Sequence, residues 1–102
     1  MKTSYQQIDV SRLKEMIDPI EFYTSEGQAI KTRGASPRKL GGLCPFHNDQ
    51  HEGSFYIHDT SGAYSCFSCG TQGGDIIDFT QIKYGLYFDE AIRRLARQWG
   101  LI

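Results

Sequence analysis

The chain has 102 residues, of which 39% are hydrophobic, 13% aromatic and 23% charged, and its formal net charge is -1. This length supports one modest hydrophobic core, and the composition excludes a disordered chain, so we expect a single domain over residues 1–102. No apolar run approaches the roughly 18 residues that span a bilayer, and Met1–Val10 lacks the layout of a secretory signal, so we expect a cytoplasmic protein without a membrane partner.

Two short helices are predicted near the N-terminus. Apolar residues recur at helical spacing over Val10–Ile17, which predicts an amphipathic helix that ends before Pro19. Asp18 followed by Pro19 is typical of an N-cap and a first helical residue, so a second helix is expected to run through Tyr23. Gly27 is expected to end it.

A basic segment follows. Gln28–Thr32 is predicted to form a short strand, and Gly34–Pro37 is predicted to form a mobile surface loop. Residues 31–39 hold four bases and no acid, whereas residues 40–82 hold five acids and no base. Any contact with nucleic acid is therefore expected to use the basic residues of this segment, which are Lys31, Arg33, Arg38 and Lys39.

The middle of the chain predicts an antiparallel meander. Its three strand-like segments are Leu40–Leu43, Ser54–His58 and Ala63–Phe67. Residues 59–62 are suited to a hairpin loop between the last two. Because side chains alternate along a strand, Phe55 and Ile57 are expected on one face, with Tyr56 and His58 on the other.

Two more helices are predicted at the C-terminal end. The first is expected to begin after an N-cap at Asp75 and to end at Gly85. The second carries an apolar stripe over Phe88–Trp99, which we interpret as core. For the arginines of this helix, a solvated helix face is favoured over a second nucleic-acid site; they are Arg93, Arg94 and Arg97.

The cysteines predict a metal site. Cys44 and His47 form C-x-x-H, while Cys66 and Cys69 form C-x-x-C followed by glycine, with 18 residues between the two pairs. Two such pairs at this separation are typical of a tetrahedral structural zinc site with four protein ligands. We therefore predict one structural Zn²⁺ and no position for a catalytic water.

Other interpretations of these residues are weaker. His51 and His58 lack ligand spacing to a cysteine and are expected to be ordinary surface residues. A thiol redox motif would need a strand and helix around the C-x-x-C, and a nucleobase deaminase would need H-x-E before P-C-x-x-C. Neither pattern is present.

The motifs together resemble the N-terminal zinc-binding domain of bacterial DnaG-type primases. The likeness spans nearly the whole chain. The residues that carry it are Gly42–His47, Ser54, Phe55, Tyr64–Gly70, Gly74, Asp75, Ile77, Asp78 and Phe79. The resemblance implies a small α+β fold: a zinc ribbon with a short antiparallel sheet flanked by N- and C-terminal helices.

The resemblance also implies a function. Primase domains of this kind engage a single-stranded DNA template so that a separate polymerase domain can start an RNA primer. The expected partners are therefore single-stranded DNA and a primase polymerase domain or replicative helicase, with no small-molecule substrate. The polymerase domain of that family, with its acidic metal-binding residues, is absent from these residues. We therefore expect a non-catalytic module, either an excised domain or a stand-alone protein such as one from a mobile element.

Single strands are held by bases stacked on aromatic rings beside cations. The candidate DNA-binding residues are Arg33, Arg38, Lys39, Tyr56, His58 and Tyr64. The alternative, in which these rings cover the core and the bases are solvated, remains open. So does a second hypothesis for function, a zinc-stabilised interaction module that docks on a replication protein without contacting DNA.

Overall fold

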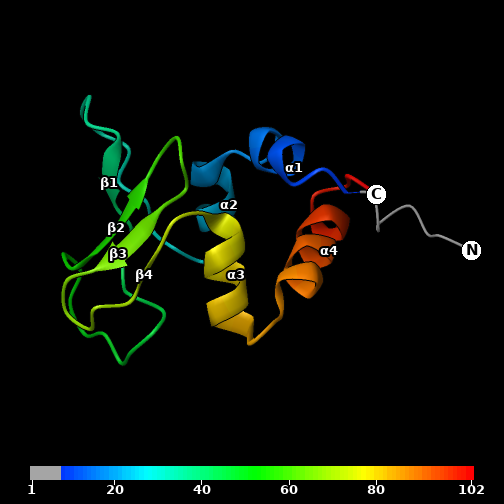
Figure 1. The fold of residues 1–102 in the computed structure, drawn as a ribbon. Helices are drawn as coiled ribbons and strands as arrows, with labels where there is room; N and C mark the ends of the chain where they lie inside the picture. Colours follow the sequence, from blue (N-terminus) through cyan, green and yellow to red (C-terminus); the bar gives the residue numbers. More distant parts are fainter. Residues whose placement is uncertain (1–7) are drawn as a thin grey trace, which may run out of the picture.

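The computed structural model describes residues 8–102, so most of the Met1–Val10 stretch lies outside the described residues. The described part has a sheet at one end, α2 and α3 beside it, and α1 and α4 on the far side (Figure 1). The helices are α1 (Val10–Met16), α2 (Pro19–Ser25), α3 (Ile76–Tyr84) and α4 (Phe88–Gln98). The strands are β1 (Arg38–Leu40), β2 (Phe55–His58), β3 (Tyr64–Cys66) and β4 (Gln72–Gly73). The predicted α+β class is confirmed.

Local capping explains where the helices begin. Asp18 accepts a hydrogen bond from the backbone N–H of Glu21 at 3.0 Å, and Asp75 accepts one from Asp78 at 2.8 Å. These bonds satisfy N–H groups that have no partner inside a helix. Helix α3 ends at Gly85, whose φ of 65° is left-handed. None of the described helices is long and apolar enough to cross a membrane.

The sheet is antiparallel throughout, with strand order β1-β2-β3-β4. Directly paired residues lie on the same face, which separates Tyr56 and His58 from Phe55 and Ile57. Phe55 and Ile57 are buried, while Tyr56 and His58 are partly exposed, as predicted. The sheet therefore has a core face and an open face.

The predicted strand at Gln28–Thr32 is wrong, because the structure has no strand there. The Gln28 side-chain amide instead donates to the carbonyls of Gly41 and Leu43, at 2.7 and 2.6 Å. A single backbone bond, from Lys31 N to Leu40 O at 3.0 Å, ties the segment to β1. Side-chain bonds therefore replace the ladder of backbone bonds that a strand requires.

The first predicted strand is displaced. Strand β1 covers Arg38–Leu40 rather than Leu40–Leu43, so Arg38 and Lys39 belong to the sheet and not to a loop. Gly42 has a φ of 77°, which turns the chain out of the extended conformation, and an added Cβ there would lie 2.8 Å from Ala29 N. The two-residue strand β4 was not predicted.

An aromatic cluster joins the helices to the sheet. The rings of Phe22, Tyr23 and Phe79 meet edge to face, with centroids 4.9 to 5.7 Å apart. All three are fully buried. The Tyr23 hydroxyl donates to the Gly62 carbonyl at 2.6 Å, and burial raises the pKa of that hydroxyl. This bond fixes the β2–β3 turn against α2.

We expect Tyr23→Phe to lower the free energy of unfolding by about 1–3 kcal/mol, because it leaves the Gly62 carbonyl buried without its donor. Urea unfolding of the zinc-loaded protein measures this loss. Tyr56→Phe is the control: Tyr56 has no hydroxyl bond within the described residues, so its stability should change by less than about 0.5 kcal/mol. Equal losses in both variants would contradict the assignment.

Candidate metal centre and open sheet face

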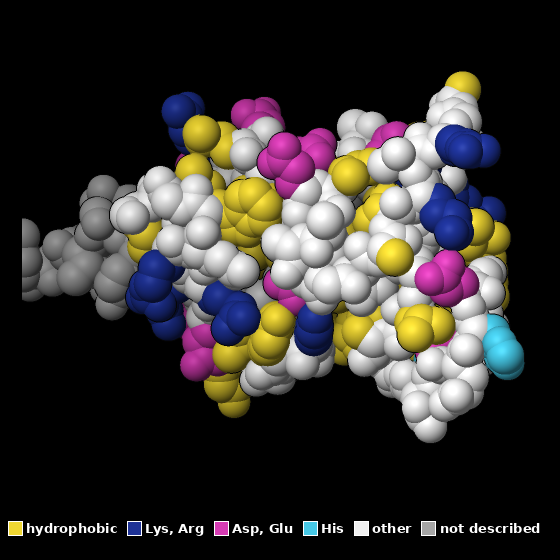
Figure 2. Space-filling model, turned by 180° about the vertical axis from the view of Figure 1, so that it is seen from behind, with side chains coloured by type: hydrophobic (Ala, Val, Ile, Leu, Met, Phe, Trp, Pro, Cys, Tyr) yellow, Lys and Arg dark blue, Asp and Glu magenta, His cyan; other side chains and the backbone are white. Residues whose placement is uncertain are grey.

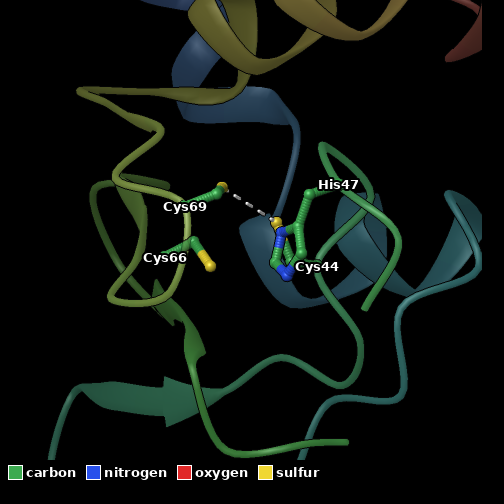
Figure 3. A group of neighbouring side chains, drawn as sticks. All are labelled: Cys44, His47, Cys66 and Cys69. Atoms are coloured by element: carbon green, nitrogen blue, oxygen red, sulfur yellow. Dashed lines mark hydrogen bonds between the residues drawn. The ribbon is translucent and has the colours of Figure 1, made fainter. Parts of the chain in front are cut away.

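Four predicted ligands converge on one point. Cys44 and His47 come from the loop after β1, Cys66 ends β3 and Cys69 lies in the turn that follows (Figure 3). One ligand atom from each of the four side chains can be chosen so that all lie within 4.8 Å of one another. Cys44 Sγ and Cys69 Sγ are 3.8 Å apart. A tetrahedral zinc ion with Zn–S bonds of about 2.3 Å needs sulfurs about 3.8 Å apart, so the donors fit zinc.

Both ligand pairs sit on tight turns. The Phe46 N–H points to Cys44 Sγ at 3.4 Å, and the Gly70 N–H donates to the Cys66 carbonyl at 2.9 Å. Gly70 has a φ of 83°, a conformation that other residues rarely adopt. The turn after Cys66 therefore brings Cys69 back beside it.

Asp49 organises the first pair of ligands. Its Oδ2 accepts the Cys44 N–H at 2.8 Å, and its Oδ1 lies 3.6 Å from His47 Nε2. The other ring nitrogen, His47 Nδ1, is buried and has no partner within the described residues. A ligating histidine commonly turns its second nitrogen to a carboxylate, so this arrangement suits ligation through Nδ1.

Two of the thiols differ in their acidity when no metal is bound. Burial raises the pKa of Cys44 to about 12, whereas hydrogen bonding to Thr71 lowers the pKa of Cys69 to about 6. Without a metal, Cys69 is therefore the more acidic of the two thiols, and Cys44 keeps its proton near neutral pH. Zinc must displace that proton, and metal affinity should rise with pH.

The remaining histidines lie outside the cluster. The four-residue group holds neither His51 nor His58. The backbone N–H of His51 points to Asp49 Oδ1 at 3.4 Å, while its side chain is exposed. His58 Nδ1 accepts the N–H groups of Thr60 and Ser61, at 3.2 and 3.0 Å. The ring of His58 therefore stabilises the β2–β3 turn.

Residues 5–102 match the family described as the CHC2 zinc finger. The chain belongs to the CHC2 zinc-finger family. A DNA primase of Thermotoga maritima is 39% identical over 90% of this chain and 15% of its own length. One of Streptomyces coelicolor is 39% identical over 91% of this chain and 14% of its own. The chain thus spans about one seventh of the length of these two curated relatives.

A solved structure is also similar to this CHC2 domain. The crystal structure of the Aquifex aeolicus primase, with its zinc-binding and RNA polymerase domains, matches 98% of this chain and 22% of that chain. The TM-score is 0.68 and the sequence identity is 28%. Together with the family, the geometry shows that Cys44, His47, Cys66 and Cys69 are positioned to bind one zinc ion.

The open sheet face of the CHC2 domain carries a second cluster. The Arg38 guanidinium lies over the Tyr56 ring at 4.1 Å and over the Phe67 ring at 4.9 Å. The two rings meet edge to face with centroids 5.5 Å apart, and Phe67 is 68% exposed. Beside them is a hollow of about 560 Å³, whose lining includes Ser65 and Gln72. We call Arg38, Tyr56 and Phe67 the sheet-face platform.

Other predicted contact residues lie elsewhere. Lys39 is 6% exposed, and its Nζ donates to the Gly34 carbonyl at 2.8 Å. Tyr64 is buried, and its hydroxyl donates to Asp78. Arg33 lies exposed in the loop before β1. Of the predicted contact residues, Arg38 and Tyr56 thus belong to the platform, while Lys39 and Tyr64 face the core.

The sequence prediction did not include Phe67. It lies in the C-x-x-C turn between the ligands Cys66 and Cys69, and its side chain is exposed while Cys66 and Cys69 belong to the metal cluster. One sequence feature could have indicated this exposed ring: Phe67 is a large apolar residue between the two cysteines of a ligand pair.

We expect Cys69→Ser to lose stoichiometric zinc and cooperative unfolding, because zinc supplies on the order of 10 kcal/mol to a small fold. Metal analysis together with thermal unfolding measures both. His51→Ala is the matched control and should keep one zinc, since His51 lies outside the cluster. One bound zinc and cooperative unfolding in Cys69→Ser would remove Cys69 from the ligand set.

We expect Asp49→Asn to keep one zinc per chain but to weaken zinc affinity by about 10- to 100-fold, because the carboxylate that faces His47 Nε2 is lost. Competition with a chromophoric chelator measures the affinity. Glu52→Gln is the control, since the ion pair that Glu52 forms within the described residues is with Lys31, at 3.5 Å. An affinity loss of the same size in both variants would argue against a role for Asp49 at the metal.

Proposed function

We propose that residues 1–102 form one non-catalytic, zinc-stabilised module that binds single-stranded DNA template in the cytoplasm. In this proposal it supports primer synthesis together with a primase polymerase domain or a replicative helicase. Membership of the CHC2 zinc-finger family and the similarity to DNA primases support it. The chain spans a small part of those relatives, which is consistent with polymerisation being carried out elsewhere.

The observation that carries the proposal is the sheet-face platform. Single strands bind to proteins through bases stacked on aromatic rings and through cations that follow the phosphates. Arg38 supplies a cation that lies over two rings, and Phe67 offers an exposed ring surface. A base can therefore stack on the guanidinium plane or on Phe67 while a phosphate contacts Arg38.

The distribution of charge on the sheet supports the same proposal. Residues 40–82 carry five acids and no base, which on its own opposes DNA binding. The side chains paired across the open face, however, include no Asp or Glu; besides Arg38 they include Tyr56, Ser65 and Gln72. The acids serve other contacts: Asp75 caps α3, Asp49 holds the Cys44 N–H, and Asp78 accepts from Tyr64.

We expect salt-dependent binding of fluorescent oligodeoxythymidine by the wild-type domain, measured by anisotropy at two salt concentrations. Arg38→Gln should lower affinity by about 10-fold or more and reduce the salt slope by about 0.7. Arg38→Lys should keep the slope but lose affinity, because the ammonium is not planar. Phe67→Ser should cost about 1–3 kcal/mol of binding through lost stacking.

Arg33→Gln is the matched control, since it removes the same charge from an exposed loop, and Arg33 lies over no ring among the described residues. If Arg38→Gln and Arg33→Gln weaken binding equally, the platform has no specific role. If the wild-type domain shows no binding at low salt, DNA is excluded, and the exposed rings instead favour the alternative, a module that docks on a replication protein.

A further inference from the structure

A second group of exposed rings lies at the corner between α3 and α4. Tyr84 ends α3, and Tyr87 and Phe88 begin α4. They are 38%, 78% and 49% exposed. In Figure 1 this corner lies at the lower end of the two helices, away from the sheet. Seen from behind, the helical half shows Lys and Arg side chains next to hydrophobic ones (Figure 2).

The Arg94 guanidinium lies over one of these rings. It is 3.8 Å from the centroid of Tyr84, and Lys83 Nζ lies over the same ring at 5.4 Å. Arg94 Nε has no hydrogen-bond partner within the described residues, so ring contact rather than hydrogen bonding orients it. The Tyr84 hydroxyl donates to Glu26 at 2.7 Å, which fixes the ring itself. The corner thus repeats the cation-on-ring arrangement of the sheet-face platform.

Most of the charged side chains near this corner have a partner. Lys83 pairs with Glu26 at 2.9 Å and Arg93 pairs with Asp89 at 3.1 Å. Arg94 and Arg97 make no ion pair with any described residue. The Glu90 carboxylate is engaged by the Tyr87 N–H at 2.8 Å. The expectation of a plainly solvated arginine face therefore fails for Arg94, which is ordered against a ring.

We propose that the α3–α4 corner is a second contact for single-stranded nucleic acid, with Arg94 and the rings of Tyr84 and Tyr87 as its centre. This inference rests on the proposed function, because it extends the path of the same strand beyond the sheet. The alternative, a protein partner, fits less well. The buried centres of protein interfaces are depleted of Lys, Asp and Glu. The exposed rings of this corner instead have Lys83, Asp89 and Glu90 as chain neighbours.

The test compares fluorescent oligodeoxythymidines of about six and about thirty nucleotides, since one small binding fold covers roughly 4–16 nucleotides. The zinc-loaded chain is used throughout, and zinc content verifies its fold. Arg94→Gln and Tyr87→Ser should each lower affinity for the long strand by about 3- to 10-fold and leave the short strand unchanged. Serine is a favoured N-cap, so Tyr87→Ser removes the ring without weakening the start of α4.

Arg97→Gln is the matched control, because it removes the same charge from the same helix without a ring contact. It should change the long-strand affinity less than Arg94→Gln does. Equal losses of affinity in the two variants would mean that Arg94 acts only through its charge, and would overturn the proposal. Unchanged long-strand affinity in Arg94→Gln and Tyr87→Ser would also overturn it and assign the rings to a protein contact.

The same titrations separate this inference from the proposed function. Arg38→Gln should weaken the binding of both oligonucleotides, because both occupy the sheet-face platform. If Arg38→Gln weakens the binding of both oligonucleotides while Arg94→Gln weakens neither, only the proposal of a second contact is overturned. If the wild-type chain binds neither oligonucleotide, both the proposed function and the second contact are overturned.

Discussion

One cross-link determines much of this fold: the convergence of four ligands from two distant turns. The strands contain only two to four residues each, which is too little pairing for a stable sheet on its own. A metal held by Cys44, His47, Cys66 and Cys69 ties the loop after β1 to the end of β3. Because the unfolded chain has no preformed site, the free energy of metal binding becomes free energy of folding.

The two ligand turns place their aromatic residues in opposite directions. Phe46, between Cys44 and His47, packs inward on Phe79 and Tyr64 with centroids 5.3 and 5.6 Å away. Phe67, between Cys66 and Cys69, points outward and meets Tyr56. The first turn therefore couples the metal to the aromatic core, and the second couples it to the open face of the sheet.

The sequence predicted the features that depend on short-range chemistry. The zinc ligands follow from spacing, and the caps at Asp18 and Asp75 follow from side chains that bond to a backbone N–H three residues later. The strands were predicted less well, since pairing partners lie far apart in the chain. Gln28–Thr32 resembles a strand, yet the Gln28 amide bonds Gly41 and Leu43 across 13 and 15 positions, which no local pattern shows.

Strand pairing also decides which of the candidate contact residues are exposed and which are buried. Arg38 and Lys39 are adjacent and equally basic, but alternation along β1 exposes Arg38 and buries Lys39 near Asp59, with Nζ 4.0 Å from the carboxylate. Register, and not composition, decides which of them can meet a ligand. Tyr56 and Tyr64 differ in the same way, since Ile57 is paired with Tyr64 on the core face and Tyr56 with Ser65 on the open face.

The position of Phe67 links the metal to the platform. Its backbone is fixed on one side by Cys66 and on the other by Cys69, and the Phe67 N–H donates to the Ser54 carbonyl at 2.9 Å. If the metal leaves, the turn loses the two thiolate bonds that hold its shape, and Phe67 is no longer held beside Tyr56 and beneath Arg38. A zinc ion bound by these four residues would thus hold Phe67 in the sheet-face platform without being part of it, because β-sheet pairing alone does not position this ring.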